Sequence, residues 1–434
     1  MSPKHLGIAL VGLSVIAAVW LLSRPDSTPA PPPPAFPVSP ASSFVNAADA
    51  EAYYVDLVRE RPSDAQARIA LAQLLLQRAR ETGEAAAYLP RVDELLSEAL
   101  ATDPANKTAR VLSASLANKR HDFEQGRDIA RALISEDPNY SHAYGLLIDA
   151  LIELGEYEEA SDVADQFSEV KPGYSLYARV AYLRELMGNG DGAIEAMRMA
   201  LDAAQAGTMD RAWAAGQLGM LYLNEGKVDT AAFIFERLLE EAPSYGHARA
   251  GLSRVASVRG ERARAIAWAE RAILDAPNDM GLQETLALAY AEAGDDARAD
   301  SVGQIVFGLM LDEERAGTNI DMEWADVMAD QGQQVGEALE RAEREYARRP
   351  KHRHVLETYA WSLHAAGRSA EAIPYAEQAL ARLPSADGKL NFRAAHIYAG
   401  AGRTDEAARQ FALALENDVH IEDATLAAQA SAER

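Results

Sequence analysis

Proline recurs along this chain at a fixed interval. Pro104, Pro138 and Pro172 lie 34 residues apart, as do Pro243 and Pro277, and Pro350 and Pro384. The two intervals between these groups are 71 and 73 residues, close to two periods each. A fixed period of this length indicates a repeat array, in which every unit is one small supersecondary structure that cannot bury its apolar face alone.

Glycines follow the same period, and they divide each unit into two halves. Gly226, Gly260 and Gly294 are 34 residues apart, and an apolar-periodic run precedes and follows each of them. Two helices joined by a glycine turn form an antiparallel hairpin. Proline then ends the second helix, because it lacks the N–H that would continue the hydrogen-bond ladder. The composition, rich in Ala, Leu, Glu and Arg with only 7% aromatic residues, also favours helix.

One unit carries a recognisable set of small and aromatic residues. Residues 218–243 contain Leu218, Gly219, Tyr222, Ala231, Phe235 and Pro243 at the spacing of a tetratricopeptide unit, and residues 394–415 are similar. The chain therefore resembles the tetratricopeptide repeat family. The resemblance implies that the small residues allow the two helices to approach closely, namely Ala160, Ala231, Ala265, Ala299, Ala372 and Ala407. In the second unit, His121 takes the place of the turn glycine and Gly126 that of the alanine.

The predicted fold is all-α. We expect about ten hairpins over residues 63–419, a capping half-unit over 46–62 and a C-terminal tail over 420–434. The family resemblance implies that these hairpins stack into a right-handed superhelical solenoid. Residues 175–186 and 357–368 also resemble a group of membrane-anchored bacterial envelope repeat proteins.

The N-terminal region predicts a membrane anchor followed by a stiff spacer. Residues 6–22 are uncharged and, as a helix, would be about 26 Å long, slightly short of a bilayer core of about 30 Å. A short n-region over residues 1–5 contains Lys4, which places the N-terminus in the cytoplasm. Residues 23–45 are rich in proline and predict a polyproline stalk. A leader that is cleaved is the alternative.

These features predict a single-pass protein whose repeats lie on the periplasmic side of a bacterial inner membrane. Cleavage of the leader would instead give an exported soluble protein. The net charge of −24 argues against nucleic acid as a partner, because such a surface repels phosphates. The chain contains no cysteine, so thiol nucleophiles and cysteine-based zinc sites are excluded.

Motifs of catalysis are missing from the sequence. It contains no GxxxxGK[ST], HExxH, GxSxG or EF-hand pattern, and no cofactor or metal site is predicted. The glycine-rich segment 188–192 falls where two helices of one unit join, and we interpret it as a solvated turn. The basic run over 340–354 is interpreted as a solvated helix face, with contact to an acidic partner or another copy as the alternative.

The first helix of each tetratricopeptide unit lines the concave groove, as the family resemblance implies. By that register, the candidate groove residues are His142, Trp213, His247, Arg254, Glu284, His354, Glu357, Trp361, His364, Phe392 and His396. Aromatic and Arg side chains are frequent anchors in protein interfaces. Ordinary packing between adjacent helices is the alternative interpretation of the same residues.

One specialised form of the family clamps the terminal carboxylate of its partner with Lys and Asn side chains. Lys389 and Arg393 match the last two clamp positions, but Thr358 replaces an Asn, so no clamp is predicted. We therefore expect a non-catalytic, membrane-tethered scaffold that binds a protein or peptide in its groove. An enzyme with an unrecognised site among groove His and Glu residues, and a self-associating structural spacer, are the alternatives.

Overall fold

The computed structural model describes residues 47–274, 276–382 and 388–416. The chain divides into two compact units, residues 1–52 and 53–434, and only residues 47–52 of the first are described. The predicted anchor over 6–22, the spacer over 23–45 and the tail over 420–434 lie outside the described residues. Within the described ranges, no helix is long and apolar enough to cross a bilayer.

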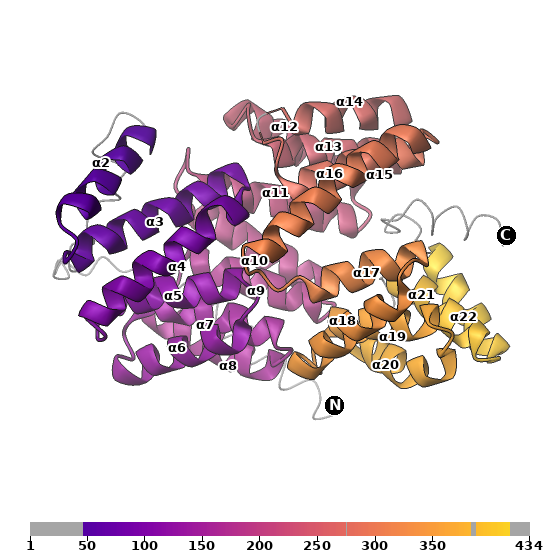
Figure 1. The fold of residues 1–434 in the computed structure, drawn as a ribbon. Helices are drawn as coiled ribbons and strands as arrows, with labels where there is room; N and C mark the ends of the chain where they lie inside the picture. Colours follow the sequence, from indigo (N-terminus) through magenta and orange to yellow (C-terminus); the bar gives the residue numbers. More distant parts are fainter. Residues whose placement is uncertain (1–46, 275, 383–387, 417–434) are drawn as a thin grey trace, which may run out of the picture. The chain divides into compact units, whose positions relative to one another are not determined.

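All regular elements in the described ranges are α-helices, which confirms the predicted fold class (Figure 1). The helix α2 comes first in sequence, and each following odd-numbered helix pairs with the next even-numbered one to form a hairpin. The helices are α2 (Ala47–Glu60), α3 (Ala65–Thr82), α4 (Ala85–Thr102), α5 (Lys107–Lys119), α6 (Phe123–Glu136), α7 (Ser141–Glu153), α8 (Tyr157–Val170), α9 (Tyr174–Leu186), α10 (Gly190–Ala203), α11 (Met209–Asn224), α12 (Val228–Glu241), α13 (Gly246–Val258), α14 (Arg262–Ala272), α15 (Met280–Glu292), α16 (Asp296–Arg315), α17 (Asp321–Gln331), α18 (Val335–Arg348), α19 (Arg353–Ala365), α20 (Ser369–Arg382), α21 (Gly388–Gly400) and α22 (Thr404–Glu416).

The side chain of Phe235 shows why the repeat residues hold each hairpin to the next. Its ring on α12 is 0% exposed. A Cβ atom added to Gly219 of α11 would lie 2.6 Å from this ring, and one added to Gly251 of α13 would lie 2.4 Å from it. The ring therefore occupies space that only glycine leaves open on both neighbouring helices, and it joins one hairpin to the next. Ala231, one turn earlier on α12, is also buried, as the repeat spacing predicts.

Turns between the paired helices use the left-handed backbone conformation. Gly226, between α11 and α12, has φ of 68°. His121 occupies the corresponding place in the α5–α6 hairpin and has φ of 58°, a conformation that costs a residue with a Cβ about 1–2 kcal/mol. The hairpin forms despite this cost. Gly126 of α6 lies close to Asn118 of α5: a Cβ atom added to Gly126 would be 1.9 Å from Asn118 Oδ1.

Buried apolar side chains form a series of clusters along the array. One cluster joins α9 to α13 around Phe235, one joins α6 to α9 around Phe167, and one surrounds Trp324 on α17. Each hairpin thus covers the apolar face that its neighbour leaves open, as expected for a solenoid of repeats. The first helices of successive hairpins consequently share one side of the array.

Candidate functional site

A cavity of about 670 Å³ extends across first helices of successive hairpins. Its lining comes from α9, α11, α13, α15, α17, α19 and α21, together with the turns after α9 and α11. We call this cavity the groove. Its lining includes Tyr182, Glu185, Leu186, Asn224, Glu225, Arg254, Ser257, Val258, Leu288, Glu292, Glu323, Asp326, Arg353, His354, Glu357, Lys389 and Arg393.

The groove crosses the helices obliquely. It is lined by the last turn of α9, at Glu185, and by the end of α11, at Asn224. On α19 and α21 it is lined instead by the first turns, at His354 and Lys389. Successive units therefore contribute different positions of their first helix, and no single position in the repeat identifies the lining.

At one end of the groove, a buried guanidinium is surrounded by carboxylates. Arg393 is 1% exposed. Its Nη1 donates to Asp326 Oδ1 at 2.6 Å and to Glu357 Oε1 at 3.1 Å, and its Nη2 donates to Asp330 Oδ1 at 2.7 Å. Lys389 Nζ donates to Asp326 Oδ2 at 3.1 Å. Lys389 and Arg393, which match the clamp positions, are thus paired with carboxylates of α17 and α19. The carboxylate of a partner would have to displace these side chains.

The charges in this cluster shift the acidity of its carboxyl groups. Burial alone would raise the pKa of Asp326, but the charges of Arg393 and Lys389 outweigh it and hold that pKa below its ordinary value. For Glu357, burial is likewise outweighed by the neighbouring imidazole of His354 and by the charge of Arg393, which lower its pKa to about 2. Both carboxylates are ionised at neutral pH, and the cluster is fixed by charge-assisted hydrogen bonds.

Another part of the groove lining, which we call the acidic wall, is rich in carboxylates. Glu185 and Glu225 lie at the ends of α9 and α11, and Glu292 ends α15. Burial raises the pKa of Glu185; a hydrogen bond from Asn224 and the charge of Arg353 lower it, while the charge of Glu225 raises it further. Asn224 Nδ2 donates to Glu185 Oε1 at 3.2 Å. The carboxylates of Glu185 and Glu225 are therefore close enough to repel each other, and that of Glu185 is partly removed from solvent.

Three of the residues predicted from sequence line the groove, namely Arg254, His354 and Glu357. The imidazole Nδ1 of His354 lies 3.7 Å from Glu357 Oε2, and its Nε2 lies 2.8 Å from the guanidinium of Arg353. These contacts connect the first turn of α19 to the cluster around Arg393.

Four other predicted residues lie together on α19 and α21 but do not line the groove. The ring of Trp361 stacks on His364 at 5.0 Å, and Phe392 contacts His396 at 4.5 Å between ring centroids. Trp361 Nε1 donates to Asp330 Oδ1 at 2.7 Å, so this ring is fixed by packing and by a hydrogen bond. Burial, and then the charge of His396, lower the pKa of His364.

The remaining predicted residues are spread over separate helices and do not line the groove. Trp213 is 39% exposed and meets Tyr174 edge to face. His247 Nε2 lies 3.2 Å from Asp279 Oδ2, His142 packs beside Tyr140, and Glu284 is exposed on α15. The structure thus brings together only part of the predicted set.

Sequence reasoning missed the acidic wall and the two aspartates of α17. Thr285 and Glu292 lie on the face of α15 that lines the groove. The predicted residue Glu284 directly precedes Thr285 in the sequence but does not line the groove. A seven-residue spacing of polar residues on α15 was a signal for this face. Nothing in the local sequence indicates that Asp326 and Asp330 meet Arg393, which lies 67 and 63 residues away.

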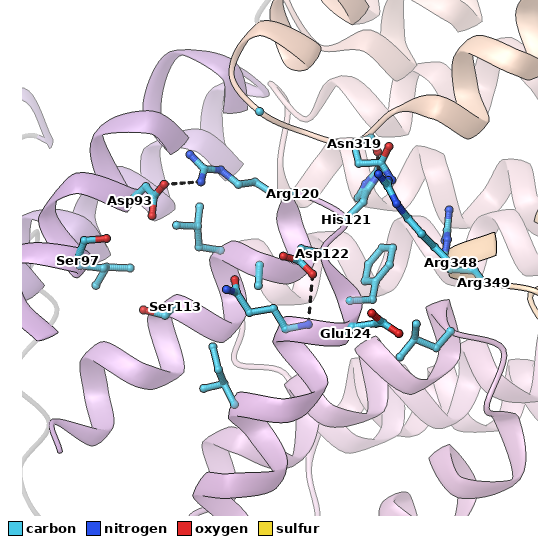
Figure 2. A pocket seen from close by; sticks show the side chains of 18 of the residues that line it. Asp93, Ser97, Ser113, Arg120, His121, Asp122, Glu124, Asn319, Arg348 and Arg349 are labelled. Carbon is cyan, nitrogen blue, oxygen red and sulfur yellow. Dashed lines mark hydrogen bonds and ion pairs between the residues drawn. The ribbon is translucent and has the colours of Figure 1, made fainter. Parts of the chain in front are cut away.

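A second cavity, of about 700 Å³, lies on other helices, and we call it the junction pocket. It is lined by α4, α5 and α6 together with residues of α18 and the segment before α17; its polar lining includes Asp93, Arg120, His121, Asn319 and Arg349. Figure 2 shows Arg120 directed toward Asp93, to which it donates at 2.6 Å, and His121 beside Asn319. None of the sequence-predicted groove residues line it.

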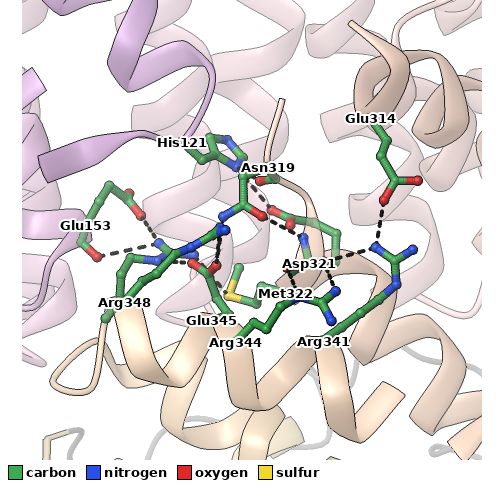
Figure 3. A network of polar contacts seen from close by, with 12 residues as sticks. His121, Glu153, Glu314, Asn319, Asp321, Met322, Arg341, Arg344, Glu345 and Arg348 are labelled. Atoms are coloured by element: carbon green, nitrogen blue, oxygen red, sulfur yellow. Dashed lines mark hydrogen bonds and ion pairs between the residues drawn. The ribbon is translucent and has the colours of Figure 1, made fainter. Parts of the chain in front are cut away.

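The side chain of Arg349 joins two segments that are distant in sequence. It is 3% exposed, pairs with Glu345 of α18, and donates to Glu153 Oε2 of α7 at 3.1 Å across 196 residues. Asn319 Nδ2 donates to Glu345 Oε2 at 2.7 Å, and the backbone N–H of Asn319 donates to the carbonyl of Arg120 at 3.0 Å. Figure 3 shows Asn319 directed toward Glu345.

The interpretation of residues 340–354 as a solvated face is correct only in part: Arg344, Arg348 and Lys351 are exposed. Arg349 and Arg353 are buried, and Arg341 and Arg344 both donate to Asp321 of α17, at 3.0 Å and 2.8 Å (Figure 3). The acidic groups that this basic run contacts belong to the same chain. Spacing along the run could not reveal this, because Glu153 and Asp321 approach it only after the hairpins have stacked.

The stacked hairpins and the groove along their first helices define a helical-repeat protein. Comparison with known families identifies the repeat: one model described as a tetratricopeptide repeat matches residues 117–182 and 222–289, and a second with the same description matches residues 323–387. The chain contains tetratricopeptide repeats, which confirms the interpretation of residues 218–243.

Solved structures show likeness in fold. TTC0263, a thermophilic TPR protein from Thermus thermophilus, is 22% identical over 42% of this chain and 92% of its own, with a TM-score of 0.37. YrrB, a TPR protein with an unusual peptide-binding site, is 18% identical over 43% and 95%, with a TM-score of 0.31. A human IFIT1 dimer with m7Gppp-AAAA is 14% identical over 85% and 86%, with a TM-score of 0.45. The comparison with curated proteins found no match.

Proposed function

We propose that this chain is a non-catalytic scaffold that binds an extended segment of a protein partner in its groove. Tetratricopeptide repeat proteins are in general protein-interaction scaffolds. The observation that carries the proposal is the continuous lining of the groove by first helices from α9 to α21. An open cavity along consecutive helices accommodates an elongated ligand, and the sequence contains no catalytic motif that would give this cavity another use.

A steric test separates groove binding from binding elsewhere. Ser257 lines the groove on α13, and the change Ser257→Trp would fill part of it. Ser168 is an exposed serine on α8, a second helix, so Ser168→Trp is the matched control. Peptides selected from a displayed library on the full chain should lose binding to Ser257→Trp and keep it with Ser168→Trp. Equal binding to both variants, at equal helicity and melting temperature, would refute the groove as the site.

The membrane tether is a second part of the proposal. Residues 6–22 would anchor the chain, and residues 23–45 would hold the repeats away from the bilayer on the extracytoplasmic side, because the segment is uncharged and the spacer is rich in proline. The full chain should remain with membranes after an alkaline wash and should be accessible to protease from outside the cytoplasm. Release into the soluble fraction with a shortened N-terminus would show that the leader is cleaved.

A further inference from the structure

The partners of charged side chains in the groove differ between the cluster around Arg393 and the acidic wall. Each basic side chain of the lining already has a partner within the chain. Lys389 and Arg393 pair with carboxylates of α17 and α19, and Arg254 and Arg353 also have partners. A ligand that carried negative charge would therefore have to compete with carboxylates that are covalently part of the protein and already in place.

The acidic wall has the opposite character. Within the described residues, no side chain donates to Glu225 or Glu292, and Glu185 receives only the amide hydrogen bond from Asn224. Glu323, on the first turn of α17, also lines the groove; its Oε2 is shielded from solvent and has no hydrogen-bond partner there. Among the described residues, the carboxylates of this wall are therefore the charged groups of the groove with the fewest partners.

The surroundings of Glu185 add an independent indication. Burial raises the pKa of Glu185, and the charge of Glu225 raises it further; the hydrogen bond from Asn224 and the charge of Arg353 only partly offset this. A cation placed between these two carboxylates would replace lost hydration and relieve their repulsion. The exposed ring of Tyr182 and the apolar side chains of Leu186 and Leu288 also line the groove, where they could cover the aliphatic stem of a Lys or Arg side chain.

We infer that the groove binds a protein segment bearing Lys or Arg side chains, whose cationic groups contact Glu185, Glu225 and Glu292. This inference rests on the proposed function and names the chemistry of the occupant. An acidic or neutral segment would leave the carboxylates of this wall without partners, whereas a basic segment satisfies them and leaves the cluster around Arg393 intact.

The test uses the full chain and three fluorescent peptides of equal length that alternate Ala with Lys, with Gln or with Glu. The groove variant combines Glu185→Gln, Glu225→Gln and Glu292→Gln. The control variant carries the same change at three exposed glutamates of second helices, Glu169, Glu236 and Glu343, so that both variants have equal net charge. At physiological salt, screening over about 8 Å limits the contribution of distant charges.

The Lys peptide should bind the parent most tightly. We expect its affinity to fall at least tenfold in the groove variant and less than twofold in the control variant. An equal loss in both variants would assign the binding to bulk charge, and tighter binding of the Glu or Gln peptide would contradict the inference. If the library peptides that lose binding to Ser257→Trp lack basic residues, the inference fails while the proposed function stands. If no library peptide loses binding to Ser257→Trp, the proposed function fails.

Discussion

Replacement of Arg393 by methionine should destabilise the C-terminal repeats strongly at neutral pH. Methionine retains much of the volume of the side chain but removes the cation that contacts Asp326, Asp330 and Glu357. Breaking a buried ion pair by removing one partner typically costs about 3–5 kcal/mol, because a charge is left buried without compensation. We expect about 3 kcal/mol, the lower end, since Lys389 remains 3.1 Å from Asp326.

The loss should depend on pH in a defined direction. The pKa of Asp326 and that of Glu357, about 2, are both lower in the folded protein than in the unfolded chain, where they are near 4. In the parent, this stabilisation is present above about pH 4 and is lost as the pH falls toward 2. In Arg393→Met the carboxylates lose the cation, so protonation relieves them, and the deficit relative to the parent should be largest at pH 7 and smaller at pH 4.

Hydrogen exchange and urea denaturation measure this loss. In a repeat array, stability is distributed over neighbouring units, so the weakened α19–α22 segment should open first. Backbone amides of α21 should exchange faster in Arg393→Met than in the parent, while those of α7 should be unchanged. The urea midpoint followed by circular dichroism should fall at pH 7 and fall less at pH 4.

The matched control is Arg368→Met, which removes an exposed guanidinium paired with Glu371. Such surface pairs contribute little to stability, so its urea midpoint should stay near that of the parent. A parent-like midpoint for Arg393→Met at pH 7, or a deficit that is the same at pH 7 and pH 4, would refute the reasoning.

Three further changes test the packing, the junction and the buried imidazole. Phe235→Ala should lower the free energy of unfolding by about 3–5 kcal/mol in urea denaturation, whereas Phe233→Ala, at an exposed position of α12, should have little effect. Gly155→Ala would place a Cβ 2.4 Å from the backbone between α18 and α19, so proteolysis there should accelerate; Gly226→Ala, with open space around it, should leave that rate unchanged. Burial holds the pKa of His352 well below its ordinary value, so the free energy of unfolding should fall as the pH drops from 7 to 5. The fall should be smaller in His352→Gln. The same dependence of stability on pH in both proteins would contradict this prediction.

Much of the fold could be predicted because the information is local. The 34-residue spacing of Pro243 and Pro277, with Gly226 and Gly260 between the helices, determines the length of each helix and the place of each turn. Ala231 and Phe235 occupy repeat positions at which the two helices of a unit approach closely, so their burial follows from the repeat. Even His121 could be recognised as a substitute for the turn glycine from its position alone.

The candidate site could be predicted only in part. A fixed register of the first helix finds Arg254, His354 and Glu357. It also selects Trp361 and Phe392, which contact Asp330 of α17 and Phe411 of α22, respectively, and do not line the groove. The reason is that the groove passes from the ends of the early helices to the beginnings of the late ones. Each unit is displaced relative to the last, and these displacements accumulate over the array.

The sequence by itself determined the helices, their pairing and the turns, because periodic apolar residues and helix-breaking residues act within one unit. Only the tertiary structure decided which charges meet. Arg349 contacts Glu153 across 196 residues, and Arg393 contacts Asp326 across 67. These contacts depend on how all the hairpins between them are rotated relative to one another, which the sequence of a single unit does not determine. They also determine which carboxylates of the groove remain available to a partner.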